Sequence, residues 1–174
     1  SYTTTITASD GASNTSSQSI TVSVNNLNDN SPVFTSGTDF SADENQTAIG
    51  TVTGSDADGD SLSFTVSGSE LAITPAGILT FASAPDFETK TSYTATVTST
   101  DGVNSTTQDI TVNVNNLNDN SPVITSDATF SADENQTAIG TVTGSDADGD
   151  SLSFTVSGSE LAITPAGILT FASA

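Results

Sequence analysis

Apolar and polar residues alternate along several short segments of the chain. In residues 93–99 the bulkier apolar side chains alternate with threonine, and residues 62–66 and 110–114 show the same alternation. A period of two residues is typical of half-buried antiparallel β-strands, and threonine at the outer positions suits a pleated surface. Glycine, proline, asparagine and aspartate separate the segments at short intervals, as tight turns require. The pattern predicts an all-β sandwich without a helix of useful length.

The pattern also repeats. The acidic stretch Asp-Ala-Asp-Gly-Asp at residues 56–60 returns at 146–150, and Asn-Asp-Asn-Ser-Pro at 28–32 returns at 118–122, so both markers recur after 90 residues. A unit of about 90 residues is long enough to close a small core of its own, unlike the shorter units of a solenoid. The sequence therefore predicts a tandem array of β-sandwich domains.

Two prolines indicate where the repeats meet. Pro32 and Pro122 restrain the residues before them to extended backbone, so the segments that they end are predicted linkers. The resulting division is residues 1–27 as the C-terminal two strands of a preceding repeat, 28–32 as linker, 33–117 as a complete repeat, 118–122 as linker, and 123–174 as the N-terminal strands of a following repeat. The complete repeat is predicted to hold about seven strands of a sandwich, near residues 33–41, 47–55, 61–67, 70–74, 77–82, 91–100 and 106–115.

Residues 130–174 are identical to residues 40–84, which leaves two interpretations of the chain. The favoured one is a window cut from a much longer repetitive polypeptide. In the alternative, the chain is a small subunit, and residues 1–27 of one copy complete residues 123–174 of a neighbour by strand complementation. Both interpretations predict an extended fibre. In it, each repeat contacts neighbouring repeats of the same chain or of an identical chain, and self-assembly is expected to be head-to-tail or lateral.

The net negative charge of the chain restricts the kinds of partner that it can bind. The chain has 21 acidic residues, one base, Lys90, and a formal net charge of −20. Such a chain repels phosphate backbones and anionic lipids, which excludes nucleic acid as a partner. No apolar run approaches the roughly 20 residues of a membrane span, so no direct membrane insertion is expected. Clustered carboxylates need counter-charge, and a divalent cation is the natural source.

Catalysis has little support in the sequence. Histidine and cysteine are absent, so no Ser/His or Cys/His nucleophile can be assembled. A paired-carboxylate hydrolase needs one protonated and one ionised carboxyl group in a cleft, whereas the acidic clusters here fall at predicted domain junctions. We therefore do not expect an enzyme.

Five acidic or Asx elements occur in a characteristic order. They are Glu44, Asp56-Ala57-Asp58, Asp86-Phe87-Glu88, Asp101-Gly102 and the linker Asn-Leu-Asn-Asp-Asn-Ser-Pro at residues 116–122. In this order and spacing they resemble a cadherin-type repeat, and the resemblance covers essentially the whole chain. It implies a seven-stranded Greek-key sandwich whose successive domains hold Ca²⁺ between them.

The resemblance also implies a ligand set. At the second junction the ligands would be Glu44, Asp86, Glu88, Asn116, Asn118, Asp119, Asn120, Asp146 and Asp148. At the first junction they would be Asn28, Asp29, Asn30, Asp56, Asp58 and Asp101. Carboxylate, amide and backbone oxygens are the ligands that Ca²⁺ prefers. Asn116 stands where the family usually has aspartate, which lowers the expected affinity. Nine other acids are expected to be solvated surface charges: Asp10, Asp39, Asp43, Asp60, Glu70, Asp109, Asp127, Asp133 and Glu160. Asn104 is noted only as part of an Asn-x-Thr/Ser triplet.

These observations favour a calcium-rigidified structural stalk or filament segment of a large adhesin or fibre, located outside the cell or on its surface. The competing hypothesis is a module that adheres directly to a cell or a glycan. A Thr/Ser/Asn surface can hydrogen-bond sugars, but the sequence offers no aromatic platform or unique loop for them.

Overall fold

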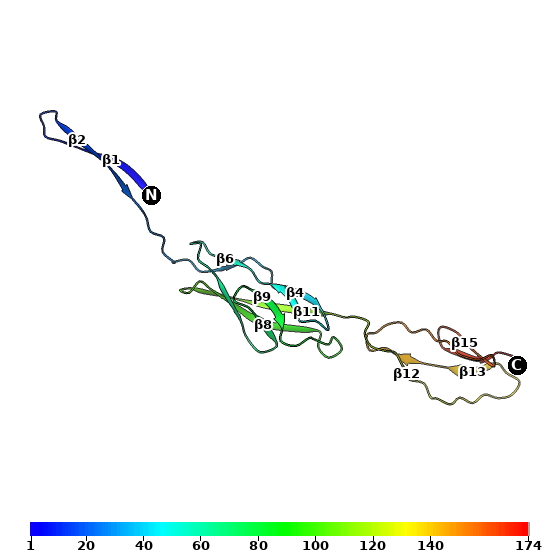
Figure 1. Cartoon of the computed structure of the whole chain (residues 1–174). Helices are drawn as coiled ribbons and strands as arrows, with labels where there is room; N and C mark the ends of the chain where they lie inside the picture. Colours follow the sequence, from blue (N-terminus) through cyan, green and yellow to red (C-terminus); the bar gives the residue numbers. More distant parts are fainter. Residues whose placement is uncertain (174) are drawn as a thin grey trace.

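The computed structural model describes residues 1–173, which contain β-strands and no helix. No helix capable of crossing a membrane occurs in that range. The strands form three successive groups along an extended molecule, with the two termini at opposite ends (Figure 1). Their bounds are β1 Tyr2–Ser9, β2 Thr15–Val22, β3 Val33–Phe34, β4 Asp39–Asp43, β5 Ala48–Thr51, β6 Gly54–Ser55, β7 Ser63–Val66, β8 Leu71–Ile73, β9 Ile78–Phe81, β10 Ser92–Thr100, β11 Ser105–Asn115, β12 Val123–Ile124, β13 Ala138–Thr141, β14 Gly144–Ser145, β15 Leu161–Ile163 and β16 Ile168–Phe171.

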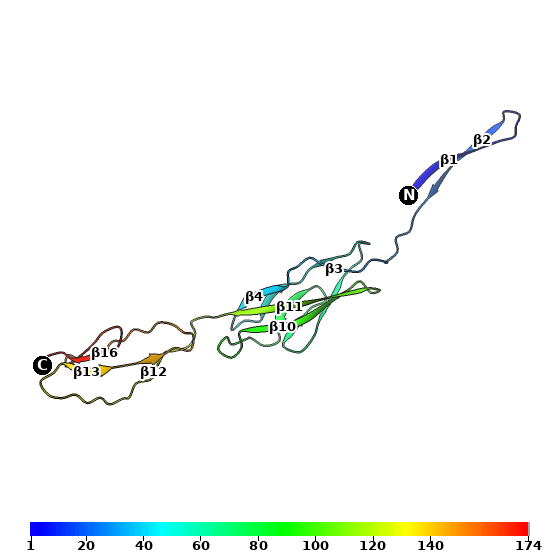
Figure 2. The ribbon, with the colours of Figure 1, turned by 180° about the vertical axis from the view of Figure 1, so that it is seen from behind.

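The middle group is a β-sandwich. One sheet has the order β4-β11-β10-β7, the other has the order β5-β9-β8, and β3 pairs with β6 at the end nearer the N-terminal hairpin (Figures 1 and 2). Within the first sheet β10 pairs antiparallel with β11 and β7, whereas β4 lies parallel to β11. The core between the sheets consists mainly of alternate strand residues, as the period of two requires, together with Val52, which follows β5. The strand residues of this core are Ala42, Phe64, Leu71, Leu79, Phe81, Val97, Ile110, Val112 and Val114. The predicted all-β sandwich class is confirmed.

Two predicted strands are each divided in the structure. Residues 33–41 give β3 and β4, and residues 47–55 give β5 and β6. The division arises because the two halves have different partners: β3 pairs with β6, whereas β4 joins β11 and β5 joins β9. The alternation of side chains says nothing about a change of partner, so the sequence pattern cannot locate these breaks.

The N-terminal group is a lone hairpin. β1 and β2 pair antiparallel over their whole length, from Tyr2 opposite Val22 to Ser9 opposite Thr15. Residues 1–27 are all exposed, because among the described residues no second sheet covers the hairpin.

In the C-terminal group, two segments form no strand although the same sequences lie in strands in the middle sandwich. β12 pairs with β14, and β13, β16 and β15 form a second small sheet. Residues 130–133 and 153–156 repeat the sequences of residues 40–43 and 63–66, which lie in β4 and β7, yet they form no strand. In the middle sandwich β4 and β7 are held by β11 and β10, and residues 123–173 contain no counterpart of that pair.

Candidate metal centre

Asp148 holds the second linker. Its Oδ2 accepts hydrogen bonds from the backbone amides of Asp119 at 3.0 Å and Asn120 at 2.8 Å, and its Oδ1 accepts one from the Asn120 side chain at 2.9 Å. The Asn116 side chain donates to the backbone carbonyl of Asp148 at 2.8 Å. One carboxylate on the loop after β14 therefore fixes the linker against the C-terminal group.

The first junction has the same arrangement. Asp58 accepts from the backbone amides of Asp29 at 3.0 Å and Asn30 at 2.9 Å, and from the Asn30 side chain at 2.9 Å. The Asn26 side chain donates to the Asp58 carbonyl at 2.8 Å. The repetition of the geometry at both junctions indicates that the linker sequence and the acidic loop determine it together.

Glu44 holds the same linker from the upstream side. This residue follows β4 and is buried, with 2% of its surface exposed. Its Oε1 accepts from the backbone amide of Leu117 at 2.7 Å and its Oε2 from that of Phe87 at 2.8 Å. A buried carboxylate is costly unless it is hydrogen-bonded, and these two amides provide that compensation. Glu44 thus brings the linker next to the loop that carries Asp86 and Glu88.

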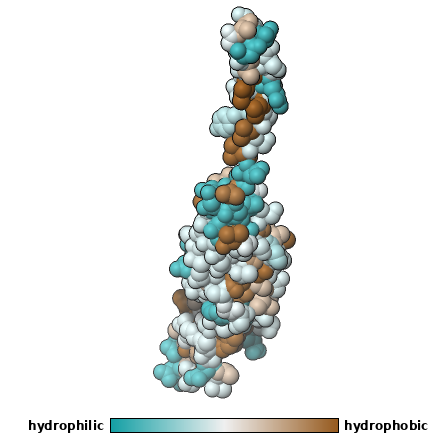
Figure 3. Space-filling view, turned by 90° about the vertical axis from the view of Figure 1, so that its left-hand side faces the viewer, coloured by the Kyte–Doolittle hydropathy of each residue, from teal (hydrophilic) through white to brown (hydrophobic). Residues whose placement is uncertain are grey.

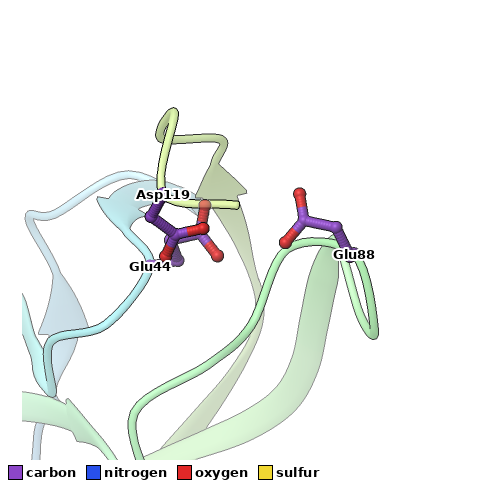
Figure 4. Close-up of side chains that lie close together, drawn as sticks. All are labelled: Glu44, Glu88 and Asp119. Carbon is purple, nitrogen blue, oxygen red and sulfur yellow. The ribbon is translucent and has the colours of Figure 1, made fainter. Parts of the chain in front are cut away.

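Carboxylates from both sides converge at the second junction. Oxygens of Glu44, Glu88 and Asp119 lie within 4.8 Å of one another, with Glu88 facing the other two from its own loop (Figure 4). Desolvation and the neighbouring charges of Glu44 and Asp148 raise the pKa of Glu88. The side chains thus carry concentrated negative charge that a cation can neutralise.

The acidic loops form further clusters. Oxygens of Asp56, Asp58 and Asp60 lie within 4.8 Å of one another, and those of Asp146, Asp148 and Asp150 do the same. Oδ1 of Asp56 accepts from the amide of Asp58 at 2.8 Å, whereas its Oδ2 is buried without a hydrogen-bond partner. A buried, unpaired carboxylate oxygen is rare in a folded protein, and a bound cation would satisfy it. The acidic clusters therefore fit a metal ion such as Ca²⁺.

Protein cations do not neutralise these clusters. Lys90 is the single base in the sequence, and its ammonium group pairs with Glu70 and lies 4.3 Å from the centre of the Tyr93 ring. The charge of the junction carboxylates is left for solvent ions or a bound metal.

The remaining predicted ligands have local roles. Asp86 accepts from the amide of Glu88 at 3.1 Å and from the Thr89 hydroxyl at 2.9 Å, which shapes their loop. Asp101 accepts from the amides of Val103 at 2.7 Å and Asn104 at 2.6 Å in the β10–β11 turn. Asn28 and Asn118 lie in the linkers beside the acidic loops, and Asn118 lines a cavity together with Asp146. The assignment of all fifteen residues as metal ligands stays a prediction.

Sequence reasoning passed over three residues that belong to the junctions. Asp60, expected at the surface, lies in the Asp56 cluster, and desolvation together with the charges of its neighbours raises its pKa. Asn104 donates to the Asn28 side chain and to the Asn30 carbonyl, both at 2.9 Å, so the β10–β11 turn holds the first linker. Asn45 has a positive φ of 63° and donates to Asp119. For Asp60 the spacing of alternate aspartates was an available signal, whereas nothing local marks the two asparagines.

A family comparison identifies the repeat. The model described as the bacterial Ig domain matches residues 28–115, half of the chain. The chain belongs to this family. The matched range comprises the first linker and the middle sandwich, so this bacterial Ig domain includes one acidic loop and its linker contacts. No curated protein matches the chain.

Several solved structures share the fold of this chain. A protocadherin gammaB7 EC3-6 cis-dimer structure is similar with a TM-score of 0.74 and 22% identity, covering 99% of this chain and 49% of that one. Mouse cadherin-23 EC22-24 gives 0.70 and 22%, covering 98% and 63%. Human CDH23 EC21-23 gives 0.73 and 21%, again covering 98% and 63%. The chain thus spans about half to two thirds of these structures, and the cadherin-type tandem fold is confirmed.

Proposed function

We propose that this bacterial Ig domain chain is a calcium-rigidified segment of an extracellular or cell-surface stalk. The observation that carries the proposal is the convergence of carboxylates at the second junction. There, Glu44 and Glu88 come from the middle sandwich, Asp119 from the linker and Asp148 from the following group. A cation bound by groups from both sides of a linker fixes the relative orientation of the two sides.

The proposed metal ligands are of two kinds, ionised carboxylates and neutral asparagine side chains. Glu44, Asp86, Glu88, Asp119, Asp146 and Asp148 would supply ionised oxygens, and Asn116, Asn118 and Asn120 neutral ones. The six carboxylates balance three divalent ions. At the first junction Asn28, Asp29, Asn30, Asp56, Asp58 and Asp101 form the downstream half of an equivalent site. Bound Ca²⁺ supplies positive charge, and the amide contacts of Asp148 and Glu44 position the linker for it.

Without calcium the same charges repel each other and weaken the junction. Calcium that binds only the folded junction stabilises it by mass action, by about 1.4 kcal/mol per site at ten times the dissociation constant. For a small domain this is a substantial part of the total stability. The function is mechanical: repeats add length, and calcium limits bending at each linker.

A structural role suits the other features of the chain. The bacterial Ig family and the cadherin-type fold are typical of structural or adhesion modules, and the acidic, cysteine-free composition suits an exported protein that uses metal in place of disulfides. Repetition adds to the length of a stalk without requiring a unique active site.

The test compares calcium with chelator at constant ionic strength, with magnesium as the matched cation control. Calcium is expected to raise the melting temperature, lengthen and stiffen the particle in small-angle scattering, and protect residues 116–122 from proteolysis. Magnesium is expected to do less, because it dehydrates reluctantly and demands a tighter octahedral site. Identical melting, dimensions and linker cleavage in calcium and chelator would refute the proposal.

A further inference from the structure

Asn45 lies in the turn between β4 and β5, and hydrogen bonds hold the backbone of this turn from two sides. The Asn45 amide donates to the Pro85 carbonyl at 3.0 Å, and the amide of the preceding Glu44 donates to the Asn115 carbonyl at 3.2 Å. The φ of Asn45 is 63°, in the left-handed region that asparagine adopts more readily than most other residues with a side chain. The turn therefore connects the loop that follows Pro85 with the end of β11, and it fixes the position from which the Asn45 side chain extends.

The Asn45 side chain reaches the second linker. Its amide group donates to Oδ2 of Asp119, a residue 74 positions later in the sequence. The Asn120 side chain donates to the other oxygen, Oδ1, at 2.9 Å. Both oxygens of Asp119 thus accept a side-chain amide, one from the sandwich and one from the adjacent linker residue.

The two hydrogen bonds to Asp119 differ in what they fix. At the first junction Asn30 donates to Oδ1 of Asp29 at 3.1 Å, as Asn120 does to Asp119, so this bond is a local property of the linker sequence. In the space-filling view, hydrophilic side chains gather at that first junction, just below the narrow hairpin (Figure 3). The Asn120 bond fixes Asp119 relative to the linker. The Asn45 bond fixes it relative to the sandwich that carries the two glutamates.

Asp119 is held at a position that suits a shared cation. Oxygens of Glu44, Glu88 and Asp119 lie within 4.8 Å of one another (Figure 4). Two oxygens that bind one Ca²⁺ at about 2.3 to 2.6 Å lie at most about 5 Å apart. Asp119 can therefore share an ion with the two glutamates without leaving its place.

The Asn45 bond also leaves room for a metal on Asp119. An ionised carboxylate has about four lone-pair sites, so two amide bonds leave about two sites free. The Asn45 amide and a cation can thus bind the same carboxylate together. Asn45 therefore orders Asp119 without competing for the ion.

We propose that Asn45 is a positioning residue that raises the calcium affinity of the second junction by ordering Asp119 in the metal-free chain. The inference rests on the calcium function proposed above. Ordering a flexible side chain on binding costs affinity, and a side chain that is already ordered avoids that cost. Asparagine suits the position because it tolerates the left-handed backbone and carries the amide donor, whereas glycine would tolerate the backbone and lack the donor.

Asn45→Gly removes the side chain while glycine keeps the same φ without strain. Calcium affinity measured by titration calorimetry is expected to fall about 3- to 10-fold, because one more side chain must be ordered on binding. Asn135→Gly is the matched control, since Asn135 is exposed, has a φ of 65° and lies in the same sequence, Ser-Ala-Asp-Glu-Asn-Gln. The affinity of this control is expected to stay within about twofold of the parent. Equal affinities for the two variants would overturn the proposal.

A double-mutant cycle tests whether Asn45 acts through Asp119. Asp119→Ala removes the carboxylate, so Asn45→Gly added to this variant is expected to change calcium affinity by less than about twofold. A general loosening of the β4–β5 turn would instead lower the affinity by the same factor in both backgrounds. That second result would contradict the positioning role.

The metal-free chain gives a further readout. In chelator, Asn45→Gly is expected to speed amide exchange at Asp119 and Asn120 by about threefold or more, because the linker loses a contact with the sandwich. Asn135→Gly is expected to leave these rates unchanged, and equal rates in the two variants would again overturn the proposal. A parent chain that binds no calcium would refute the calcium stalk and this inference together. A parent chain that binds calcium and stiffens, with unaltered affinity in Asn45→Gly, would refute the positioning role alone.

Discussion

Asn120 binds both oxygens of Asp148. Its backbone amide donates to Oδ2 at 2.8 Å and its side-chain amide to Oδ1 at 2.9 Å. Asn30 and Asp58 form the same pair at the first junction, at 2.9 Å for each bond. The pair connects a linker residue to a loop 28 residues later in the sequence, so it orients one group of strands relative to the preceding linker. The same carboxylate is among the proposed calcium ligands.

Replacing this carboxylate tests both of its roles. Asp148→Asn removes one negative charge and one acceptor, so calcium affinity measured by titration calorimetry is expected to fall by about tenfold or more. Scattering in chelator is expected to show a more flexible linker. Asp127→Asn is the matched control, because Asp127 is an exposed acid in the same group of strands. Equal calcium affinities for the two variants would contradict the assignment of Asp148.

Glu44 allows a comparison within one molecule. Glu44→Gln places an amide group against the backbone amides of Leu117 and Phe87, leaving a buried donor unpaired. The variant is expected to lose about 1 to 3 kcal/mol of unfolding free energy in chelator. Glu134 occupies the same sequence, Ser-Ala-Asp-Glu-Asn-Gln, but is exposed, so Glu134→Gln is expected to change stability by less than about 0.5 kcal/mol. Equal denaturation midpoints for the two variants would be inconsistent with the amide contacts of Glu44.

Low pH is expected to weaken the carboxylate hydrogen bonds that hold the two linkers. The Asn30 amides lower the pKa of Asp58 below its ordinary value of 3.8, and the Asn120 side chain lowers that of Asp148 in the same way. Both groups thus contribute stability that is fully present above about pH 3.8 and is lost as pH falls through their lower folded-state values. Amide exchange or chemical shifts of Asn30 and Asn120 can follow this loss in chelator.

Two other carboxylates act in the opposite direction. Desolvation raises the pKa of Glu88 above 4.5 and that of Asp60 above 3.8. Their ionised forms therefore destabilise the folded state at neutral pH. Lowering the pH through their raised folded-state pKa values protonates both groups and removes this destabilisation. Stability in chelator is expected to peak at mildly acidic pH. Calcium is expected to remove the loss of stability at neutral pH, because it binds the ionised forms of these carboxylates. Thermal melts between about pH 3 and about pH 8 check this, and a chelated profile with its maximum at neutral pH would count against it.

A glycine turn anchors the middle sandwich. Gly77 has a φ of 88°, and a Cβ added there would lie 2.1 Å from the Val52 carbonyl oxygen. Gly77→Ala is therefore expected to cost about 3 kcal/mol or more, from a clash added to left-handed backbone strain. Gly59 also has a positive φ, 83°, but open space around it, so Gly59→Ala is expected to cost only about 1 kcal/mol. Denaturant unfolding measures both, and similar losses would show that the close approach to Val52 is unimportant.

Much of the fold could be predicted because it follows from local alternation. The period of two placed Val97, Ile110 and Val112 on one face of their strands, and all three are buried. The division of residues 33–41 into β3 and β4 could not be predicted, because each half pairs with a different strand.

Prediction of the candidate site was incomplete for a similar reason. Ordered carboxylates indicated Glu44, Glu88 and Asp119, whose oxygens the structure brings together. Asn104 was missed as a linker contact because it lies more than 70 residues from Asn28 and Asn30, and only folding brings them together. The side chain of an asparagine in a turn carries no sequence signal for so distant a partner.

The sequence by itself determined the repeat, the faces of the strands, the surplus of negative charge and the positions of the acidic loops. The tertiary structure decided which segments become strands and which carboxylates meet. The sequence Phe-Ser-Ala-Asp lies in β4 at residues 40–43 and forms no strand at 130–133. The physical reason is that a β-strand satisfies its backbone through a neighbouring strand, and among the described residues only the first copy has β11 beside it.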